Sequence, residues 1–274
     1  MPNAQRDARA AFAMTSATDH FVETPNGRLF ARAWSPADHS QSAPIVLMHD
    51  SLGSVELWRD FPALLCARTQ REVIAYDRLG FGRSDARTDR LTPAFVKQEA
   101  EIYVPRLLDH FKTERFVAFG HSVGGAMAVC CGAVLINATS AIITESAQMF
   151  AEELTLRGIT AAKAEYADSE RFARLKRYHG EKTAWVLSAW TDTWLSREFA
   201  NWSVRDELRS VRCPLLCLHG DRDEFGSLRQ LEVAREFSGS AAETRVFQGL
   251  GHVPHREDPE SVLTQAAPFL ANCV

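Results

Sequence analysis

The sequence lacks the long apolar run that a membrane-spanning helix requires. Hydrophobic residues make up 46% of its 274 residues, yet no apolar stretch reaches the roughly 18 residues needed to cross a bilayer. Charge of one sign is not in large excess either, because the formal net charge is only -4. We therefore expect neither a nucleic acid nor a membrane as a partner. The composition is that of a globular protein large enough for one domain with an insertion.

Cysteine pairs with metal-binding spacing are also missing. None of the six cysteines forms a C-x-x-C motif, and Cys213 and Cys217 are four residues apart in a predicted strand. Most of the cysteines lie in apolar segments, which favours buried free thiols over disulfides. The first residues, Met1–Ala13, lack the apolar stretch of a secretory signal. We therefore expect a cytoplasmic protein with an N-terminal extension over residues 1–18, whichever of Met1 and Met14 is the start.

The sequence does contain short apolar runs that alternate with helical segments. Ile45–Met48 is such a run and is typical of a strand buried on both faces of a sheet. Near the N-terminus, Asn26-Gly27 predicts a turn between two antiparallel strands, the first beginning at Asp19. Thr92–Phe111 is expected to be a helix kinked at Pro105. Internal repeats and low-complexity linkers are missing, and the pattern predicts an α/β fold with a mostly parallel, doubly wound sheet of eight strands.

The alternation breaks between residues 146 and 204, where the sequence has helical propensity. We expect a helical cap here, inserted after the sixth strand between two core segments, residues 19–145 and 205–274. Its tryptophans could pack a small helical subdomain, and some could line an apolar pocket above the strand ends. The aromatic residues expected at that pocket are Phe150, Trp185, Trp190 and Trp194.

One motif stands between a predicted strand and a predicted helix. Gly120-His-Ser-Val-Gly124 follows an apolar run and precedes a segment of small residues. Strand, G-x-S-x-G and helix together are typical of a nucleophile elbow, in which a serine occupies a strained turn. Side chains at the two glycine positions would collide with the neighbouring strand and helix. Ser122 is therefore the candidate nucleophile.

A serine hydroxyl needs a neighbouring base to take its proton, and histidine suits this role near neutral pH. His252 follows the last predicted strand, in a Gly-His loop, which is where a base would lie in the chain order serine, acid, histidine. His255 is the competing candidate, although its neighbourhood suggests a surface or supporting position. His121 is next to Ser122 in sequence, but its side chain is expected to point away from the serine.

The acid that orients the histidine has two main candidates. Asp221 and Asp223 both follow the apolar run at residues 213–218, and position alone does not choose between them. Acyl transfer also needs N–H groups that face the developing oxyanion. We expect these from the backbone of Val123 and of Ser51, with Leu52 as the alternative to Ser51.

Together these loops resemble those of the α/β-hydrolase family from about Asp19 to the C-terminus. In that family the Gly-x-x-Asp pattern carries the catalytic acid, so the resemblance implies Asp223. It also implies that the insertion is a cap and that neither a cofactor nor a metal is needed. A serine at the elbow distinguishes the chain from the haloalkane dehalogenases and epoxide hydrolases of this fold. The segments that carry the resemblance are the loop at His49, Asp77-Arg-Leu-Gly-Phe-Gly-Arg-Ser-Asp85, the elbow, Gly220-x-x-Asp223, and Gly251-His252 followed by Glu257 and Pro259.

The chain looks most similar to small cofactor-free members of the family. This resemblance implies cleavage of a carboxylic ester, thioester or lactone of a small apolar or aromatic molecule, through an acyl-enzyme on Ser122. The alternatives are a carbon–carbon bond hydrolase of aromatic ring-cleavage products and a non-catalytic ligand-binding member of the fold. Asp50 stands where the family usually has glycine; its carboxylate could contact the substrate or turn into a loop hydrogen bond. Asp50, Leu52 and Val253 are expected at the substrate site, and either a monomer or a homodimer fits the sequence.

Overall fold

The N-terminal part of the sheet is a β-hairpin. The computed structural model describes residues 15–37 and 42–273, so most of the expected N-terminal extension lies outside the described residues. Strands β1 (Thr15–Thr24) and β2 (Gly27–Pro36) pair from Thr24–Gly27 to Thr15–Pro36. The turn therefore lies one residue before the expected Asn26-Gly27 pair. The strand also begins earlier than Asp19, because the hairpin register continues through four small, largely exposed residues, three of them polar, that carry no apolar pattern.

Eight strands in the described part of the chain form one sheet, in the order β1-β2-β4-β3-β5-β6-β7-β8. β2 is antiparallel to both β1 and β4, and every other pair is parallel. The predicted mostly parallel sheet of eight strands is confirmed. The remaining strands are β3 (Ile45–Met48), β4 (Val73–Tyr76), β5 (Phe116–His121), β6 (Thr139–Glu145), β7 (Leu215–Gly220) and β8 (Ala242–Phe247).

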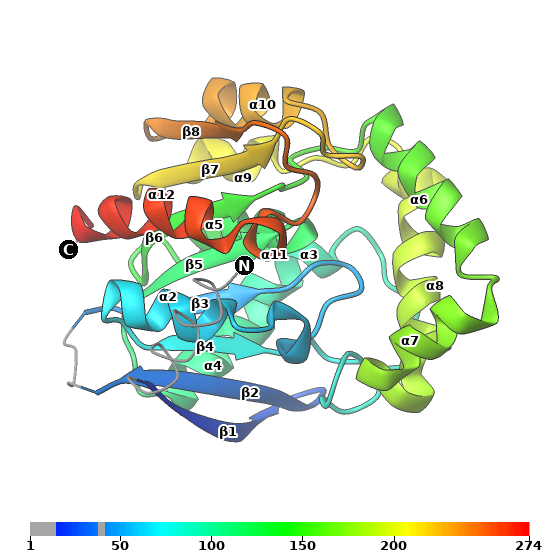
Figure 1. The fold of residues 1–274 in the computed structure, drawn as a ribbon, viewed down its shortest axis with the longest axis horizontal. Helices are drawn as coiled ribbons and strands as arrows, with labels where there is room; N and C mark the ends of the chain where they lie inside the picture. Colours follow the sequence, from blue (N-terminus) through cyan, green and yellow to red (C-terminus); the bar gives the residue numbers. More distant parts are fainter. Residues whose placement is uncertain (1–14, 38–41, 274) are drawn as a thin grey trace.

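Helices cover both faces of the sheet (Figure 1). Every residue of the five central parallel strands, β3 to β7, is buried, so neither face can remain open to water. On one face, α2 (Phe61–Thr69) and α12 (Pro259–Ala271) complete a cluster with the side chains of the central strands. On the other face, α5 (Val123–Val134) packs with α9 (Arg205–Ser210) and α10 (Arg229–Phe237).

The segment before β5 differs from the single kinked helix expected over Thr92–Phe111. It consists of α3 (Phe95–Gln98), a π-helical turn η2 (Glu99–Tyr103) and α4 (Val104–His110). The N–H of Val104 donates to the carbonyl oxygen of Glu99, five residues earlier. Pro105 then lies in the first turn of α4, where its missing N–H costs little. The π-helical turn thus lies directly before the proline, within a helical segment that is continuous from Phe95 to His110.

Between β6 and β7 the chain leaves the sheet and forms a group of helices. Figure 1 shows α6, α7 and α8 standing together beside the sheet, on the side toward which the parallel strands point. None of the helices in the described residues is long and apolar enough to cross a lipid bilayer. The helices of this insertion are α6 (Glu153–Glu165), α7 (Ser169–His179), η3 (Gly180–Lys182), α8 (Thr183–Trp194) and η4 (Arg197–Phe199); η1 (Val55–Trp58) and α11 (Pro254–Glu257) lie in the core.

Candidate active site

Ser122 occupies a sharp turn between β5 and α5. Its backbone has φ 59° and ψ -125°, a conformation that non-glycine residues rarely adopt. A Cβ atom at Gly120 would lie 1.9 Å from the carbonyl oxygen of Gly124, and one at Gly124 would lie 2.0 Å from that of Met48. Neither position has room for a side chain, since these backbone atoms cannot move independently of the sheet. The structure therefore has the close packing that the glycine spacing predicted around Ser122.

A chain of hydrogen bonds joins Ser122 to His252 and Asp223. The Nε2 atom of His252 lies 3.0 Å from Ser122 Oγ, and its Nδ1 lies 2.8 Å and 2.9 Å from the two carboxylate oxygens of Asp223. These side chains follow the ends of β5, β7 and β8; β7 and β8 are neighbours in the sheet, and β6 lies between β5 and β7. Parallel strands bring their carboxyl ends to one edge, and the three loops converge there.

The Asp223 carboxylate is fully buried, with 0% of its side chain exposed. Burial opposes its ionisation, but the hydrogen bond from His252 and the electrostatic interaction with its ring outweigh this and lower the pKa of Asp223. Its Oδ1 also accepts the N–H groups of Phe225 and Gly226, at 2.8 Å and 3.0 Å. Asp221, the other candidate acid, instead accepts the N–H of Gly249 at 2.6 Å.

The loop that carries His252 is fixed from two sides. The carboxylate of Glu257 accepts the N–H groups of Gly251 and Val253, at 2.7 Å and 3.0 Å. On the other side, Nε2 of His121 lies 2.8 Å from the carbonyl oxygen of His252. The imidazole of His252 is therefore held by its backbone as well as by Asp223.

The expected oxyanion donors lie beside the nucleophile. Val123 is the first residue of α5, so its N–H has no acceptor within the helix. The alternative donor, the N–H of Leu52, is occupied by Oδ1 of Asp50 at 2.7 Å. Ser51 lines the cavity next to Ser122, and its N–H has no acceptor among the described residues. The pair consisting of Val123 and Ser51 thus stays the candidate for this role.

Asp50 forms a partly buried ion pair with His121. Its Oδ2 lies 3.4 Å from Nδ1 of His121, whose side chain is 1% exposed. Both ring nitrogens of His121 face an oxygen, and only the imidazolium form can donate to both. Burial opposes that charge, but the hydrogen bond and charge of Asp50 outweigh it and raise the pKa of His121. Burial likewise opposes the charge of Asp50, yet His121 lowers the pKa of this carboxyl well below its ordinary value.

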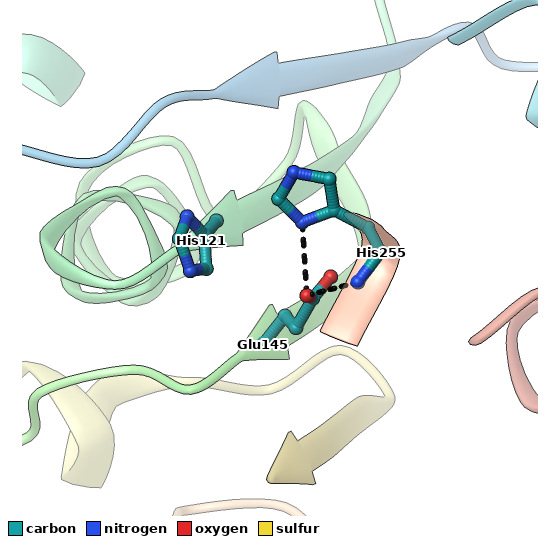
Figure 2. Close-up of side chains that lie close together, drawn as sticks. All are labelled: His121, Glu145 and His255. Atoms are coloured by element: carbon teal, nitrogen blue, oxygen red, sulfur yellow. Dashed lines mark hydrogen bonds and ion pairs between the residues drawn. The ribbon is translucent and has the colours of Figure 1, made fainter. Parts of the chain in front are cut away.

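His121 also belongs to a close cluster with Glu145 and His255, whose candidate ligand atoms all lie within 4.8 Å of one another. Figure 2 shows that the backbone N–H and the ring Nδ1 of His255 both reach the same oxygen of Glu145, at 2.8 Å and 2.9 Å. His255 is therefore buried, at 4% exposure, and not at the surface. A metal ion here would have to displace the proton on Nδ1 of His255 and compete with the partners of His121. Hydrogen bonds within the protein account for the cluster.

A cavity of about 290 Å³ opens above Ser122, between the strand ends and the helical insertion. Asp50, Leu52, Trp190, Trp194 and Val253 line it, as does His121. Two of the aromatic residues expected here lie elsewhere. The ring of Phe150 packs under Arg205, and Phe150 forms a backbone bridge with Ser203. Trp185 faces Phe81 instead and donates through Nε1 to the carbonyl oxygen of Asp89.

The sequence analysis missed several residues of the cavity. Gln148, 3% exposed, accepts a hydrogen bond from Ser122 Oγ at 3.0 Å. It follows β6, and its position after a parallel strand was the only signal that could have identified it. Tyr166 and Arg171 come from the ends of α6 and α7, where nothing in the sequence marks a cavity. Phe225, two residues after Asp223, packs against His252 with ring centroids 4.9 Å apart.

Solved structures of similar shape share little sequence with the chain. A 2-hydroxy-6-oxo-6-phenylhexa-2,4-dienoate hydrolase from Rhodococcus sp. strain RHA1 matches with a TM-score of 0.79 and 16% identity, over 94% of this chain and 99% of that one. A carboxylesterase from Bacillus subtilis matches with a TM-score of 0.70 and 16% identity, over 100% and 99%. A bacterial membrane phospholipase A matches with a TM-score of 0.75 and 21% identity, over 99% and 91%. At such identities the likeness shows the fold alone.

Comparison with curated protein sequences gives no match. The sequence model of the alpha/beta hydrolase family, in contrast, matches residues 45–265. This range spans the elbow, the loop of Asp223, the loop of His252 and the helical insertion. The resemblance described from the sequence is confirmed, and the chain belongs to the alpha/beta hydrolase family.

Proposed function

We propose that the protein is a serine hydrolase that cleaves a carboxylic ester, thioester or lactone of a small apolar or aromatic molecule. The observation that carries the proposal is the hydrogen-bonded chain Ser122–His252–Asp223, with 3.0 Å between Ser122 Oγ and His252 Nε2. Its order and distances are those of a nucleophile, a base and an orienting acid.

In the first half of the reaction, Ser122 Oγ attacks the carbonyl carbon as Nε2 of His252 takes the hydroxyl proton. The negative charge that develops on the carbonyl oxygen is stabilised by the N–H groups of Val123 and Ser51. When the tetrahedral intermediate collapses, His252 returns the proton to the leaving alcohol or thiol. Asp223 keeps a proton on Nδ1 of His252 and stabilises the imidazolium without taking the proton itself.

In the second half, a water molecule attacks the acyl-enzyme and His252 again acts as base. The cavity supports an apolar substrate, because Leu52, Ile159, Trp190, Trp194 and Phe225 supply much of its wall. An acyl or aromatic group in contact with these side chains would lose its hydration on binding.

Replacing Ser122 by alanine tests this proposal. Since the nucleophile is lost, we expect kcat/KM for a p-nitrophenyl ester to fall by at least about 10³-fold, and a fluorophosphonate probe to label the wild type but not the variant. Ser238→Ala, at the end of α10, is the matched control; it should hydrolyse the ester and be labelled by the probe as the wild type is. Wild-type turnover in Ser122→Ala would refute the assignment. Faster turnover of a ring-cleavage diketone than of any ester, thioester or lactone would favour the carbon–carbon hydrolase instead.

A further inference from the structure

Gln148 reaches the same atom of the nucleophile as His252 does. Ser122 Oγ lies 3.0 Å from Oε1 of Gln148 and 3.0 Å from Nε2 of His252. A serine hydroxyl has one proton and can donate to only one of them. The proton on Nδ1 of His252 faces Asp223, so Nε2 is an acceptor and competes with Gln148 for that single proton. The resting serine thus cannot donate to both groups that converge on it.

A water molecule can satisfy both groups at once, because it has two protons and two lone pairs. It can donate one proton to Nε2 of His252 and the other to Oε1 of Gln148. If the amide is turned around, the same water can accept a hydrogen bond from Nε2 of Gln148. With its oxygen toward Ser122, the amide can share a water with His252 without competing for the single proton of the serine.

The loop that carries Gln148 is held in place at an energetic cost. Ser146 has φ 48°, in the left-handed region, and its buried hydroxyl has no partner among the described residues. The N–H groups of Met149 and Phe150 both donate to Oε1 of Gln230, a buried residue of α10. Backbone strain and an unpaired polar atom persist where surrounding contacts enforce them, and they are concentrated at functional sites. The position of Gln148 is thus specified by the fold.

We propose that Gln148 is a catalytic residue of the second half-reaction, where it holds the hydrolytic water. The inference rests on the proposed function. In the acyl-enzyme, Ser122 Oγ is an ester oxygen without a proton, so both Gln148 and Nε2 of His252 are free to bind water. The water oxygen bonds to the acyl carbon while His252 takes one of its protons. The bond between that carbon and Oγ then breaks, the proton passes from His252 to Oγ, and the carboxylic acid leaves.

If Gln148 holds the hydrolytic water, removing its hydrogen bond should slow the second half-reaction and leave the first nearly unchanged. Gln148→Met keeps the length and volume of the side chain but removes its hydrogen bond. We expect attack on the first substrate to change by less than about threefold, since His252 still activates Ser122. Hydrolysis of the acyl-enzyme should become about 10- to 100-fold slower. The acylated protein should then accumulate during turnover.

The experiment compares wild type, Gln148→Met, Gln148→Asn and the control Gln265→Met, which makes the same change on α12 where Gln265 contacts Arg245. The rate of fluorophosphonate labelling reports the reactivity of Ser122. Intact-mass spectrometry of p-nitrophenyl butyrate reactions, quenched during steady state, reports the acylated fraction. Both Gln148 variants should be labelled at nearly the wild-type rate and accumulate the butyryl adduct, whereas Gln265→Met should match the wild type.

Equal slowing of labelling and turnover, without an adduct, in either Gln148 variant would overturn the inference, because Gln148 would then only orient the serine. Unchanged turnover in both would overturn it as well. If Gln148→Met does not fold, the test rests on Gln148→Asn, which keeps an amide on a shorter side chain. If the wild type is neither labelled on Ser122 nor able to hydrolyse the ester, the proposed function itself has failed, which is a different result.

Discussion

At the scale of single residues, Asp50 has a structural explanation. Its carboxylate, at a position where the family resemblance led us to expect glycine, does not stand free in the cavity. It accepts the N–H of Leu52 and pairs with His121, whose other nitrogen contacts the carbonyl oxygen of His252. Asp50 therefore acts on the base indirectly, by holding the protonated ring that supports the backbone of His252.

Removing the charge of Asp50 should destabilise the fold in a pH-dependent manner. For Asp50→Asn at pH 5.5 we expect a loss of about 2 kcal/mol, less than for a fully buried pair, because the Asp50 side chain is 29% exposed. The pKa of His121 is raised above 6.5 and that of Asp50 is lowered below 3.8. The pair therefore stabilises the folded protein fully between pH 3.8 and pH 6.5, the ordinary pKa values of the two groups. This stabilisation is lost as the pH rises through the folded-state pKa of His121, and as the pH falls through that of Asp50.

Urea unfolding at pH 5.5 and pH 9 measures this difference. The loss in Asp50→Asn should shrink at pH 9, whereas Asp221→Asn, which keeps an oxygen acceptor for the N–H of Gly249, should change little at either pH. An equal loss at both pH values would mean that the protonation of His121 does not change between them, which would contradict this account.

The sequence predicted Ser122 and His252 because each follows a recognisable strand, and loops after parallel strands share an edge. The choice of Asp223 over Asp221 came from the family resemblance. The sequence did not reveal the pair of Asp50 and His121. Their contact depends on the side-chain directions of two strand ends, and spacing along the chain does not determine those directions. Gln148 went unnoticed for a similar reason, since a single polar residue in a loop has no pattern.

At the scale of elements, the elbow depends on how closely α5 approaches β3 and β5. The strand and the helix are separated by one residue in a strained conformation, so the helix N-terminus meets the strand backbone directly. This closeness places the N–H of Val123 beside Ser122 Oγ. The glycines at both ends of the motif are thus a condition for the candidate oxyanion site.

Gly124→Ala should therefore destabilise the protein by about 3 kcal/mol or more, since the added carbon would overlap a backbone oxygen that cannot retreat. Gly180→Ala is the matched control: its φ is +58°, and nothing lies within 4 Å of the added atom. It should cost only about 1 kcal/mol, from backbone conformation alone. Thermal or urea unfolding measures both, and similar losses would show that crowding at the elbow is unimportant.

Element boundaries were predictable where apolar residues mark them. Ile45–Met48 forms β3 over the predicted range, because each of its residues is buried. The start of β1 and the π-helical turn before Pro105 were not predictable. The first depends on pairing with β2, and the second on an extra residue within a helical turn, and neither leaves an apolar signature.

At the scale of the whole molecule, the cavity is built by two parts of the fold that are fastened together. His179 at the end of α7 accepts the N–H of Gly82 and contacts the carbonyl oxygen of Leu52. It therefore ties the insertion to two loops of the core. The wall above Ser122 comes from α6 and α8, and its floor from the strand ends. Trp190 lies against Phe225, with ring centroids 6.0 Å apart, where these two parts meet.

Trp190→Ala should shift substrate preference toward longer acyl chains. Removing the indole leaves room for additional methylene groups, and each one buried contributes about 0.8 kcal/mol. We expect the ratio of kcat/KM for a long p-nitrophenyl ester to that for the acetate to rise by about tenfold. Trp185→Ala, on the same helix but outside the cavity, should leave this ratio unchanged. A similar shift in both variants would show that the effect arises from a loosened insertion.

The sequence predicted the insertion and its position but not which aromatic side chains face the cavity. Trp185, Trp190 and Trp194 share α8, and only their rotation relative to the core separates them. That rotation follows from contacts such as those of Trp185 with Phe81 and Asp89. Such contacts between distant segments have no trace in local periodicity.

The pairing of Asp50 with His121 also constrains how this chain can diverge. A charged group at either position is tolerable only while the other is present, because each would otherwise be left as an uncompensated charge at the base of the site. We therefore expect the effects of substitutions at the two positions to depend on each other. A descendant with glycine at position 50 would no longer need a charged ring at position 121, because an unpaired imidazole can release its proton near neutral pH. Losing the histidine first would instead leave the Asp50 carboxylate without its cation, so the order of the two changes would matter.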